Sequence, residues 1–572
     1  MEGRQIVQWD KDSCADAGFL KIDLLGLGML SAVERCVEEI GRARERRLDL
    51  SRIPLDDSET FESIQAAETT GVFQIESRAQ MQMLPRTLPE DLDDLTVQVA
   101  LVRPGPIQGG AIHPYIERRK RQREDPGFEI PYDHPLLEGV LEETLGTIVF
   151  QEQVIEVAMA LSGFSSSEAE GLRRAMSRKR SEEELRKYHD RFVAGAAERG
   201  VAIGTAERVW AQIEGFSGFG FPKAHSAAFG LLAYQSAWLR IHYAPEFLCS
   251  LLNEQPMGFY PPDALVHEAR RRGVRVAGPD ANRSRVLCHV ERARGGLLVR
   301  VGLGYVKGVR EEEMKSLVAA RERGGPFRGV ADLASRAGAG RDGLERLAWA
   351  GALDEIPPDM GRERREALWQ VGVAPVGRRT GEHAQLALPL EPSPPPPLEP
   401  LGDWERTIAD YRSTGMALGE HPMGLMRSGL GLELLSSSDL SKAADGNEVQ
   451  VGGMVVARQR PETAKGIVFM LLEDERGTIN LIVPPLVYER HRATVRAAPL
   501  IRARGRLERR EGTVNVLVAE LGELERPRDD PRRPASPQAG SPPRPLLAHR
   551  ERAVAELRAV APAGHSFGRR GQ

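Results

Sequence analysis

A run of prolines divides the sequence into two parts with different patterns. Pro392 is followed closely by the stretch 394–397, in which every residue is proline. Consecutive prolines favour a stiff polyproline II segment that joins neither a helix nor a sheet. Before this linker the hydrophobic residues recur with helical spacing, and after it they alternate as in strands. A single helical bundle or a single sheet is therefore excluded, and for 572 residues we expect about three or four domains.

Helical periodicity dominates from residue 30 to residue 255. The pattern predicts an early strand within 19–27, ended by glycine, and then a series of helices separated by short glycine and proline breaks. The clearest of these helices are expected at 32–47, 153–161, 167–176 and 226–242. Residues 256–372 predict short helices that alternate with glycine turns.

A β pattern follows between residues 448 and 524. Five strand-like runs lie at 449–451, 467–472, 478–483, 500–504 and 513–518. Five strands in about 75 residues favour an OB-type barrel. After Glu525 the sequence is rich in proline, arginine and serine, which predicts a disordered tail with a candidate helix at 549–560.

Charge and cysteine content exclude several classes of protein. Lys and Arg number 78 against 82 Asp and Glu, so the chain is not a uniformly basic nucleic-acid-coating protein, although a local basic channel is allowed. The four cysteines are far apart and form no CxxC or Cys/His cluster, which disfavours a zinc ribbon and a disulfide scaffold. The uncharged stretch 224–239 is too short and too polar to cross a membrane. We expect a cytoplasmic protein with no membrane partner.

Lys21 and Asp23 are two residues apart in the strand expected at 19–27, so they share one face of it. A carboxylate there suits a divalent metal ion, and an ammonium group suits a phosphate, as a phosphoryl-transfer centre requires. An ordinary exposed strand also carries such ion pairs, and the local pattern alone favours that simpler interpretation.

Two basic segments point to phosphate binding. The segment 172–180 contains five basic residues, and the segment 220–226 opens the next predicted helix, whose N-terminal amides are suited to anions. Together they fit a triphosphate, although a solvated basic helix and an ordinary turn would show the same residues. The candidate nucleotide ligands are Arg173, Arg174, Lys179, Lys223, His225 and Ser226.

Two further segments suggest interaction sites. Residues 385–390 read Gln-Leu-Ala-Leu-Pro-Leu, a short apolar peptide suited either to a partner's pocket or to folding back on its own domain. Residues 303–309, before a helical run, fit a helix–hairpin–helix, in which glycine-turn amides grip a DNA phosphate without reading sequence. Its candidate DNA-binding residues are Gly304, Lys307 and Gly308.

Taken in order, these segments resemble motifs of the C-family DNA polymerases, the family of the bacterial DNA polymerase III alpha subunit. The resemblance runs from Gly18 to Leu524, and residues 21–27 resemble the last palm motif. Five segments resemble fingers motifs of the family: 70–78, 103–106, 150–153, 173–176 and 223–229. Residues 252–260 resemble the error-prone branch, and residues 385–390 resemble a sliding-clamp peptide.

The resemblance implies a multidomain, mainly α-helical fold with a C-terminal β-barrel. The expected parts are the end of the palm with its catalytic strand at 1–28, helical fingers at 29–255, a tandem helix–hairpin–helix and clamp-binding domain at 256–372, a clamp-binding peptide and Pro-rich linker at 373–400, a connector at 401–446, an OB fold at 447–525 and the tail at 526–572.

The resemblance also implies a function, that of a DNA-directed DNA polymerase in replication or in error-prone, damage-tolerant synthesis. Asp23 would then be a catalytic ligand of Mg²⁺, and Lys21 would lie near the primer end. The six candidate nucleotide ligands would bind dNTPs, and the hairpin would bind primer–template DNA. Gln385, Leu386, Leu388 and Leu390 would bind the sliding clamp, and other replisome or mutasome proteins are further expected partners.

One feature departs from the family pattern. The family carries an N-terminal PHP domain and two more catalytic aspartates before the position of Lys21. The acidic residues that precede Lys21 do not form the expected Asp-x-Asp strand. We therefore expect the C-terminal portion of a larger polymerase. The alternative is a DNA- and clamp-binding portion without polymerase activity of its own.

Overall fold

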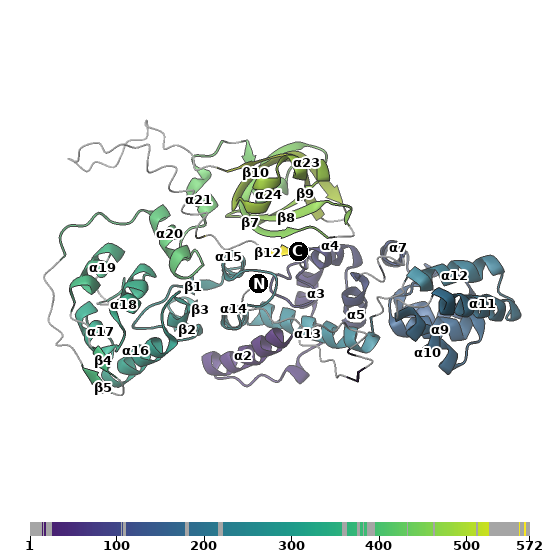
Figure 1. The fold of residues 1–572 in the computed structure, drawn as a ribbon, viewed down its shortest axis with the longest axis horizontal. Coiled ribbons are helices and arrows are strands. Elements are labelled where there is room, and N and C mark those ends of the chain that lie inside the picture. Colours follow the sequence, from purple (N-terminus) through teal and green to yellow (C-terminus); the bar gives the residue numbers. More distant parts are fainter. Residues whose placement is uncertain are drawn as a thin grey trace.

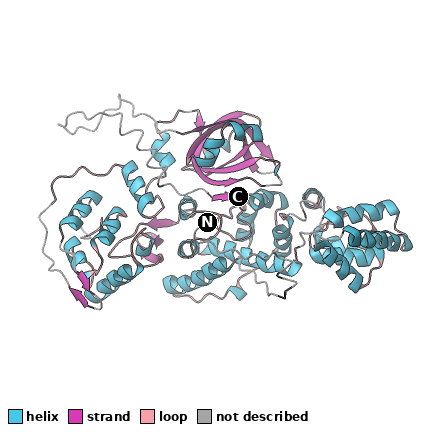
Figure 2. Cartoon of the chain, in the orientation of Figure 1, coloured by secondary structure: helices cyan, strands magenta, loops and turns pink. Residues whose placement is uncertain are grey.

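The computed structural model describes most of the chain. The described residues are 14, 17–18, 26–103, 106, 110–177, 182–215, 221–356, 363–374, 378–380, 383–385, 395–431, 433–461, 464–510, 513–524, 560 and 565–567. Only the backbone is described for residues 177, 182, 184, 378–380, 383–385, 510 and 565–567. Helical regions lie at both ends of an elongated molecule, and a β-barrel lies over its middle (Figures 1 and 2).

Seven helices and one 3-10 turn build the central body in the described part of the chain. They are α2 (Leu27–Arg44), η1 (Leu50–Arg52), α3 (Ser58–Gln65), α4 (Arg78–Thr87), α5 (Leu92–Leu101), α13 (Lys223–His242), α14 (Ala244–Asn253) and α15 (Pro262–Arg271). Helix α13 is buried on several sides, because Leu232, Tyr234 and Leu239 all lie in the core. Asp57, Ser77 and Asp91 cap α3, α4 and α5 through their side-chain oxygens.

A second helical lobe lies beside this body, at the right of Figure 1. Helix α7 (Ile112–Glu124) packs on α4 and α5 of the body through Tyr115 and Ile116. The lobe contains η2 (Pro135–Leu137), α8 (Glu138–Leu141), η3 (Glu142–Thr144), α9 (Gln151–Ser162), α10 (Ser166–Ser177), α11 (Glu182–Glu198) and α12 (Ile203–Gly215). The lobe has its own core, which includes Leu161, Leu172 and Phe192. The helices expected at 153–161 and 167–176 are confirmed as α9 and α10.

Residues 275–300 form a small sheet where the sequence predicted only helices and turns, so that prediction was wrong. Strands β1 (Arg275–Ala277), β2 (His289–Ala293) and β3 (Gly296–Arg300) pair in the order β1-β3-β2. Arg294 and Gly295 make the hairpin turn, and the φ of Gly295 is +88°. Val290 and Val299 join the core of the central body, so this core crosses the boundary expected at residue 255.

A further helical region follows, at the left of Figure 1. It contains η4 (Leu303–Tyr305), α16 (Glu311–Gly324), α17 (Val330–Arg336), α18 (Arg341–Trp349), α19 (Arg364–Val373), and the paired strands β4 (Arg378–Thr380) and β5 (His383–Gln385). Its core includes Met314, Phe327 and Leu347. Helices α20 (Asp403–Ser413) and α21 (Pro422–Arg427) then connect this region to the barrel.

The barrel confirms the predicted OB fold. Strand β6 (Leu434–Leu435) and helix α22 (Ser437–Leu440) precede β7 (Glu448–Gln459), β8 (Val468–Glu473), β9 (Thr478–Val483), α23 (Pro485–Arg490), α24 (Arg492–Ala497), β10 (Leu500–Arg510) and β11 (Thr513–Glu523). The strand order is β10-β11-β9-β8-β7, and pairing of β10 with β7 closes the barrel. Strands β7, β10 and β11 are longer than predicted.

One strand lies within the tail that the sequence predicted to be disordered. Strand β12 (His565–Phe567) pairs in parallel with β7, so the tail prediction was wrong at these residues. Three residues of mixed polarity carry no strand signal of their own. The pairing of β7 with β10 ends at Met454, so the edge of β7 at 457–459 is open and supplies the hydrogen-bond partners of β12. Except for Val560, the helix expected at 549–560 lies outside the described residues.

The barrel packs directly on the central body (Figure 1). The side chain of Arg78, at the start of α4, donates through Nη1 to the carbonyl oxygens of Met470 at 2.8 Å and Leu481 at 3.3 Å. Its guanidinium group lies 5.0 Å from the centre of the Phe469 ring. Strands β8 and β9 are the second and third strands of the barrel, and their outer face is the usual ligand face of an OB fold. Here that face contacts the body.

No helix in the described ranges combines the length and the apolar character needed to span a lipid bilayer.

Candidate nucleotide- and DNA-binding site

Arg173 and Arg174 lie next to each other on α10 and share one carboxylate. Arg173 donates to Glu170 through Nε at 2.8 Å and Nη2 at 2.7 Å, and Arg174 donates through Nε at 3.0 Å. These bonds hold the pKa of Glu170 down at about 2. The two arginines are one turn from Glu170, so the helix itself fixes the arrangement. The result is a pair of neighbouring arginines on the surface of the helical lobe, both bonded to Glu170.

The start of α13 forms the second half of the site. Glu152, in the first turn of α9, accepts a hydrogen bond from the backbone N–H of Lys223 at 3.0 Å. The ammonium group of Lys223 pairs with Glu143, and this contact raises the pKa of the lysine. A carboxylate therefore occupies the position at the helix N-terminus where an anionic ligand would bind.

Glu152 links the two halves of the site. The pKa of Arg173 is raised, first by its bonds to Glu170 and further by the charge of Glu152. Glu152 thus lies within electrostatic range of Arg173 while it caps α13. The binding of one anion by Arg173 and Lys223 stays a prediction, and Glu152 is the carboxylate that acts on both residues. Lys179 lies outside the described residues.

A row of rings extends along α13 from this point. The ring of His225 lies between Phe221, at 5.0 Å between ring centres, and Phe229, at 4.2 Å. Phe229 in turn lies 5.3 Å from Phe73. At the other end of the row, the guanidinium group of Arg103 lies 4.5 Å from the centre of the Phe221 ring. Phe73, Arg103 and Phe229, one residue from each of three family-like segments, therefore lie along one row of contacts.

Gly26 connects this row to the segment that carries the predicted catalytic motif. A Cβ atom at Gly26 would lie 3.1 Å from Cζ of Phe73 and 3.4 Å from Cε1 of Phe229, and the φ of Gly26 is +91°. Glycine is favoured here because the backbone approaches two rings and adopts a left-handed conformation. Lys21 and Asp23 themselves lie outside the described residues.

Ser226 has a different surrounding from the other predicted ligands. Its side chain is fully buried, and its hydroxyl donates to the carbonyl oxygen of Thr96 on α5 at 2.6 Å. The hydroxyl is therefore engaged within the protein, where it fixes α13 against α5. The sequence could not show this, because serine at a helix start suits an anion and a neighbouring carbonyl equally well.

The hairpin at 303–309 is partly engaged inside the protein. The backbone N–H of Gly304 donates to the carbonyl oxygen of Val286 at 2.9 Å, and that of Lys307 donates to Ser413 at 2.7 Å. The ammonium group of Lys307 also donates to the carbonyl oxygen of Tyr411 at 3.0 Å. Gly308 sits in the turn itself with a φ of +79°, at the exposed end of the hairpin.

The predicted clamp peptide is described only at its first residue. Gln385 is the last residue of β5 and pairs with Arg378. Leu386, Leu388 and Leu390 lie outside the described residues.

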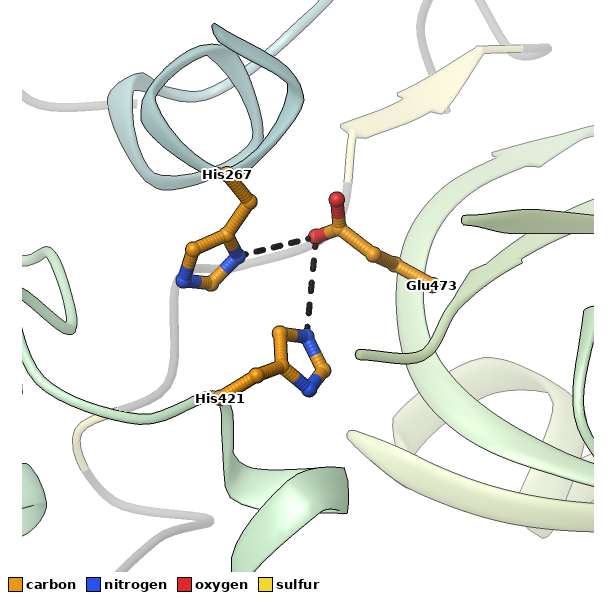
Figure 3. A group of neighbouring side chains, drawn as sticks. All are labelled: His267, His421 and Glu473. Atoms are coloured by element: carbon orange, nitrogen blue, oxygen red, sulfur yellow. Dashed lines mark hydrogen bonds and ion pairs between the residues drawn. The ribbon is translucent and has the colours of Figure 1, made fainter. Parts of the chain in front are cut away.

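One group of histidine and carboxylate side chains in the described part of the chain places its ligand atoms close enough to hold a metal ion. His267 on α15, His421 at the start of α21 and Glu473 at the end of β8 offer atoms within 4.8 Å of one another (Figure 3). All three are buried. His267 Nδ1 lies 3.1 Å from Glu473 Oε2, and Arg271 donates to Glu473 Oε1 at 2.7 Å.

The hydrogen bonds of His421 show that this group does not suit a metal ion. The backbone N–H of Met423 donates to His421 Nδ1 at 3.1 Å, so the neutral ring carries its proton on Nε2. That nitrogen faces Glu473 Oε2 at 3.9 Å, where a metal ion would need a lone pair. Mg²⁺ moreover prefers oxygen ligands.

The same group instead forms an interdomain joint, made of Asp263, His267, Arg271, His421 and Glu473. Burial alone would raise the pKa of Glu473, but His267, His421 and Arg271 outweigh it and hold this pKa well below its usual value. Burial would lower the pKa of His267, but Asp263 and Glu473 outweigh it and raise this pKa. The contacts of His267 and Arg271 with Glu473 therefore tie α15 to the barrel.

Comparison with known proteins agrees with this architecture. Residues 29–200 match the family model described as the bacterial DNA polymerase III alpha subunit finger domain. Residues 273–367 match a helix–hairpin–helix motif, and residues 449–524 match an OB-fold nucleic acid binding domain.

Three curated relatives, each named error-prone DNA polymerase, illustrate the similarity. The protein from Anaeromyxobacter sp. (strain K) is 44% identical over 92% of this chain and 47% of its own length. That of Burkholderia pseudomallei (strain K96243) is 44% identical over 91% and 49%, and that of Mycobacterium tuberculosis (strain CDC 1551 / Oshkosh) is 41% identical over 92% and 46%. The chain spans about half the length of the curated relatives it matches.

Fingers, hairpin and barrel models thus match in the order in which the motifs occur, and over about nine tenths of its length the chain is similar to error-prone DNA polymerases, with a finger domain like that of the bacterial DNA polymerase III alpha subunit.

Proposed function

We propose that this chain binds DNA and the incoming dNTP in template-directed synthesis by an error-prone, damage-tolerant polymerase. One observation carries the proposal: the carboxylate of Glu152 caps the N-terminus of α13, where it accepts from the backbone N–H of Lys223 at 3.0 Å, and its charge also acts on Arg173 of α10. A side-chain carboxylate that caps a helix next to several cations marks a site suited to a phosphate.

The triphosphate of a dNTP would replace the carboxylates of Glu152 and Glu143. Arg173, Arg174 and Lys223 would then neutralise phosphate oxygens, and His225 would add a further donor from its position between two rings. Lys179 belongs to the same proposed set. Cations placed where negative charge shifts during the reaction stabilise the transition state as well as the bound substrate.

The proposed reaction is nucleotidyl transfer. The 3′-hydroxyl of a primer loses its proton and attacks the α-phosphorus of the dNTP, the new phosphodiester bond forms, and pyrophosphate leaves. Asp23 would hold Mg²⁺, and Lys21 would lie near the primer end. When bound, a pair of such ions stabilises the attacking and leaving oxygens.

A second candidate function is binding of DNA and the sliding clamp by this chain without synthesis. The palm-like segment of the sequence offers one aspartate, Asp23, whereas two ions about 4 Å apart require several carboxylates. The hairpin residues Gly304, Lys307 and Gly308 would contact the DNA backbone, and the 385–390 segment would contact the clamp. Other replisome or mutasome proteins are further proposed partners, and the cytoplasm is the proposed location.

Binding of a fluorescent dNTP to the chain tests the nucleotide site. Arg173→Gln and Lys223→Gln should each weaken binding about tenfold or more, because each removes a charged donor to phosphate. Glu152→Gln should strengthen binding, because it removes the competing charge. Lys315→Gln, a change on the exposed face of α16, is the matched control. Equal affinity in all four variants would show that the dNTP binds elsewhere.

A further inference from the structure

A cavity of about 470 Å³ lies between the hairpin and α20, apart from the nucleotide site. Lys307 contributes from the hairpin, Arg346 and Trp349 from α18, and Arg365 from α19, while α20 closes the cavity with an apolar wall that includes Ile408. The volume falls within the range of sites that enclose small organic ligands.

The lining carries more positive than negative charge. Lys307, Arg346, Arg365 and Arg412 line the cavity together with a single carboxylate, that of Glu405. Glu405 is already paired with Arg365 at 3.3 Å. No carboxylate in the described ranges lies within ion-pair distance of Lys307 or Arg346, whose closest polar contacts are to backbone carbonyls.

Two glycines leave the space that Arg346 and Lys307 occupy. A Cβ atom at Gly308 would lie 2.5 Å from Nη1 of Arg346, so the guanidinium group rests on the bare turn of the hairpin. A Cβ atom at Gly415 would lie 3.1 Å from Nζ of Lys307. Both glycines have positive φ values, +79° and +81°, so other residues would be disfavoured for two reasons. The cations are therefore positioned by the fold.

Trp349 adds a flat apolar surface beside them. Its side chain is 44% exposed, and in the described part of the chain it is the most exposed aromatic side chain. An aromatic ring next to Lys307 and Arg346, which have backbone carbonyls and no carboxylate of the described residues as partners, matches a ligand with a flat ring and a negative charge, which is the chemistry of a nucleotide.

We propose that this cavity binds one nucleotide of single-stranded DNA, with the base stacked on Trp349 and the adjoining phosphate held by Lys307 and Arg346. The inference rests on the proposed DNA binding and deepens it, because the hairpin alone would contact only the backbone. The neighbouring apolar wall of α20 closes over the base. Stacking on Trp349 is open to any base, since every base offers a stacking face.

The test measures binding of a fluorescein-labelled oligothymidylate of 15 residues to the full chain by fluorescence anisotropy. Trp349→Ala should weaken binding by about 5- to 150-fold, the range for loss of one base-stacking contact. Trp349→Phe, which keeps an aromatic ring, should recover most of the affinity. Lys307→Gln and Arg346→Gln should also weaken binding, whereas Arg52→Gln, on the exposed 3-10 turn η1, should not.

Two further probes separate the outcomes. An oligonucleotide with abasic sites should bind the wild type and Trp349→Ala equally, because it has no base to stack. Titration with duplex DNA tests the proposed function independently. If the wild type binds duplex DNA but the Trp349 and Arg346 variants bind oligothymidylate like the wild type, the cavity inference is wrong and the proposed function stands. If an acidic aromatic peptide fills the cavity and oligothymidylate does not, the cavity is a protein-docking site. Circular dichroism confirms that each variant is folded.

Discussion

Glu473→Gln should loosen the barrel from the central body. The carboxylate of Glu473 accepts from His267 at 3.1 Å and from Arg271 at 2.7 Å. Each bond from a charged donor contributes about 1.5–3 kcal/mol, which gives a ceiling of about 6 kcal/mol. Glutamine keeps one acceptor oxygen at the same place, so we expect a loss of about 2–3 kcal/mol in the free energy that holds the interdomain joint closed.

Native-state hydrogen exchange of peptides from β8 and β9 measures this loss. Two to three kcal/mol corresponds to about a 30- to 150-fold faster exchange of the amides that open with the joint. Glu448→Gln is the matched control, because Glu448 pairs with Arg504 within the barrel and on its surface. Exchange of β8 and β9 within about threefold of the wild type would refute the reasoning, since it would show that the buried pair adds nothing to docking.

Three further predictions concern pH, catalysis and the clamp. Because the pKa of His267 is raised, this residue stabilises docking fully below its usual pKa of 6.5 and loses that effect as the pH rises through the raised pKa. Because the pKa of Glu473 is lowered, this residue stabilises docking fully above its usual pKa of 4.5 and loses that effect on acidification. The protection of β8 amides, which is their exchange rate relative to the intrinsic rate at the same pH, should therefore be highest between pH 4.5 and pH 6.5. His267→Gln should remove the loss of protection on the alkaline side. In a polymerase that contains the other catalytic carboxylates, Asp23→Ala should abolish primer extension and leave DNA binding intact. This chain alone should extend no primer, and Asp23-dependent synthesis by the chain would contradict that expectation. Micromolar binding to a sliding clamp, measured by surface plasmon resonance, should disappear without a change in Tm when alanine replaces Gln385, Leu388 and Leu390.

Local pattern was sufficient for most of the elements. Helix α13 begins at Lys223, three residues before its predicted start, because Pro222 precedes the first turn and fixes the entry of the chain. The five barrel strands follow the predicted alternation, although β7 and β10 continue past it through bulges near Val455 and Arg504. Strand β12 could not be predicted, because it forms only where β7 offers a partner.

The site was predictable in composition and not in its contacts. The basic residues of α10 and α13 stand out in the sequence, but Glu152 is 71 residues from Lys223 and no local signal joins them. The joint is harder still, because His267 and Glu473 are 206 residues apart and each looks like an ordinary polar residue in its own segment. Trp349 carried no signal, since an exposed tryptophan is recognised only from the folded surface.

Salt-dependent binding of primer–template DNA tests the central claim most directly. Because the hairpin, the basic helix and the cavity all offer cations to phosphates, the logarithm of the binding constant should fall linearly with the logarithm of the salt concentration, with a slope steeper than about −2. Duplexes of different sequence should give the same line. A flat plot, or a clear preference for one sequence, would contradict the assignment of this chain to the DNA-binding part of a polymerase.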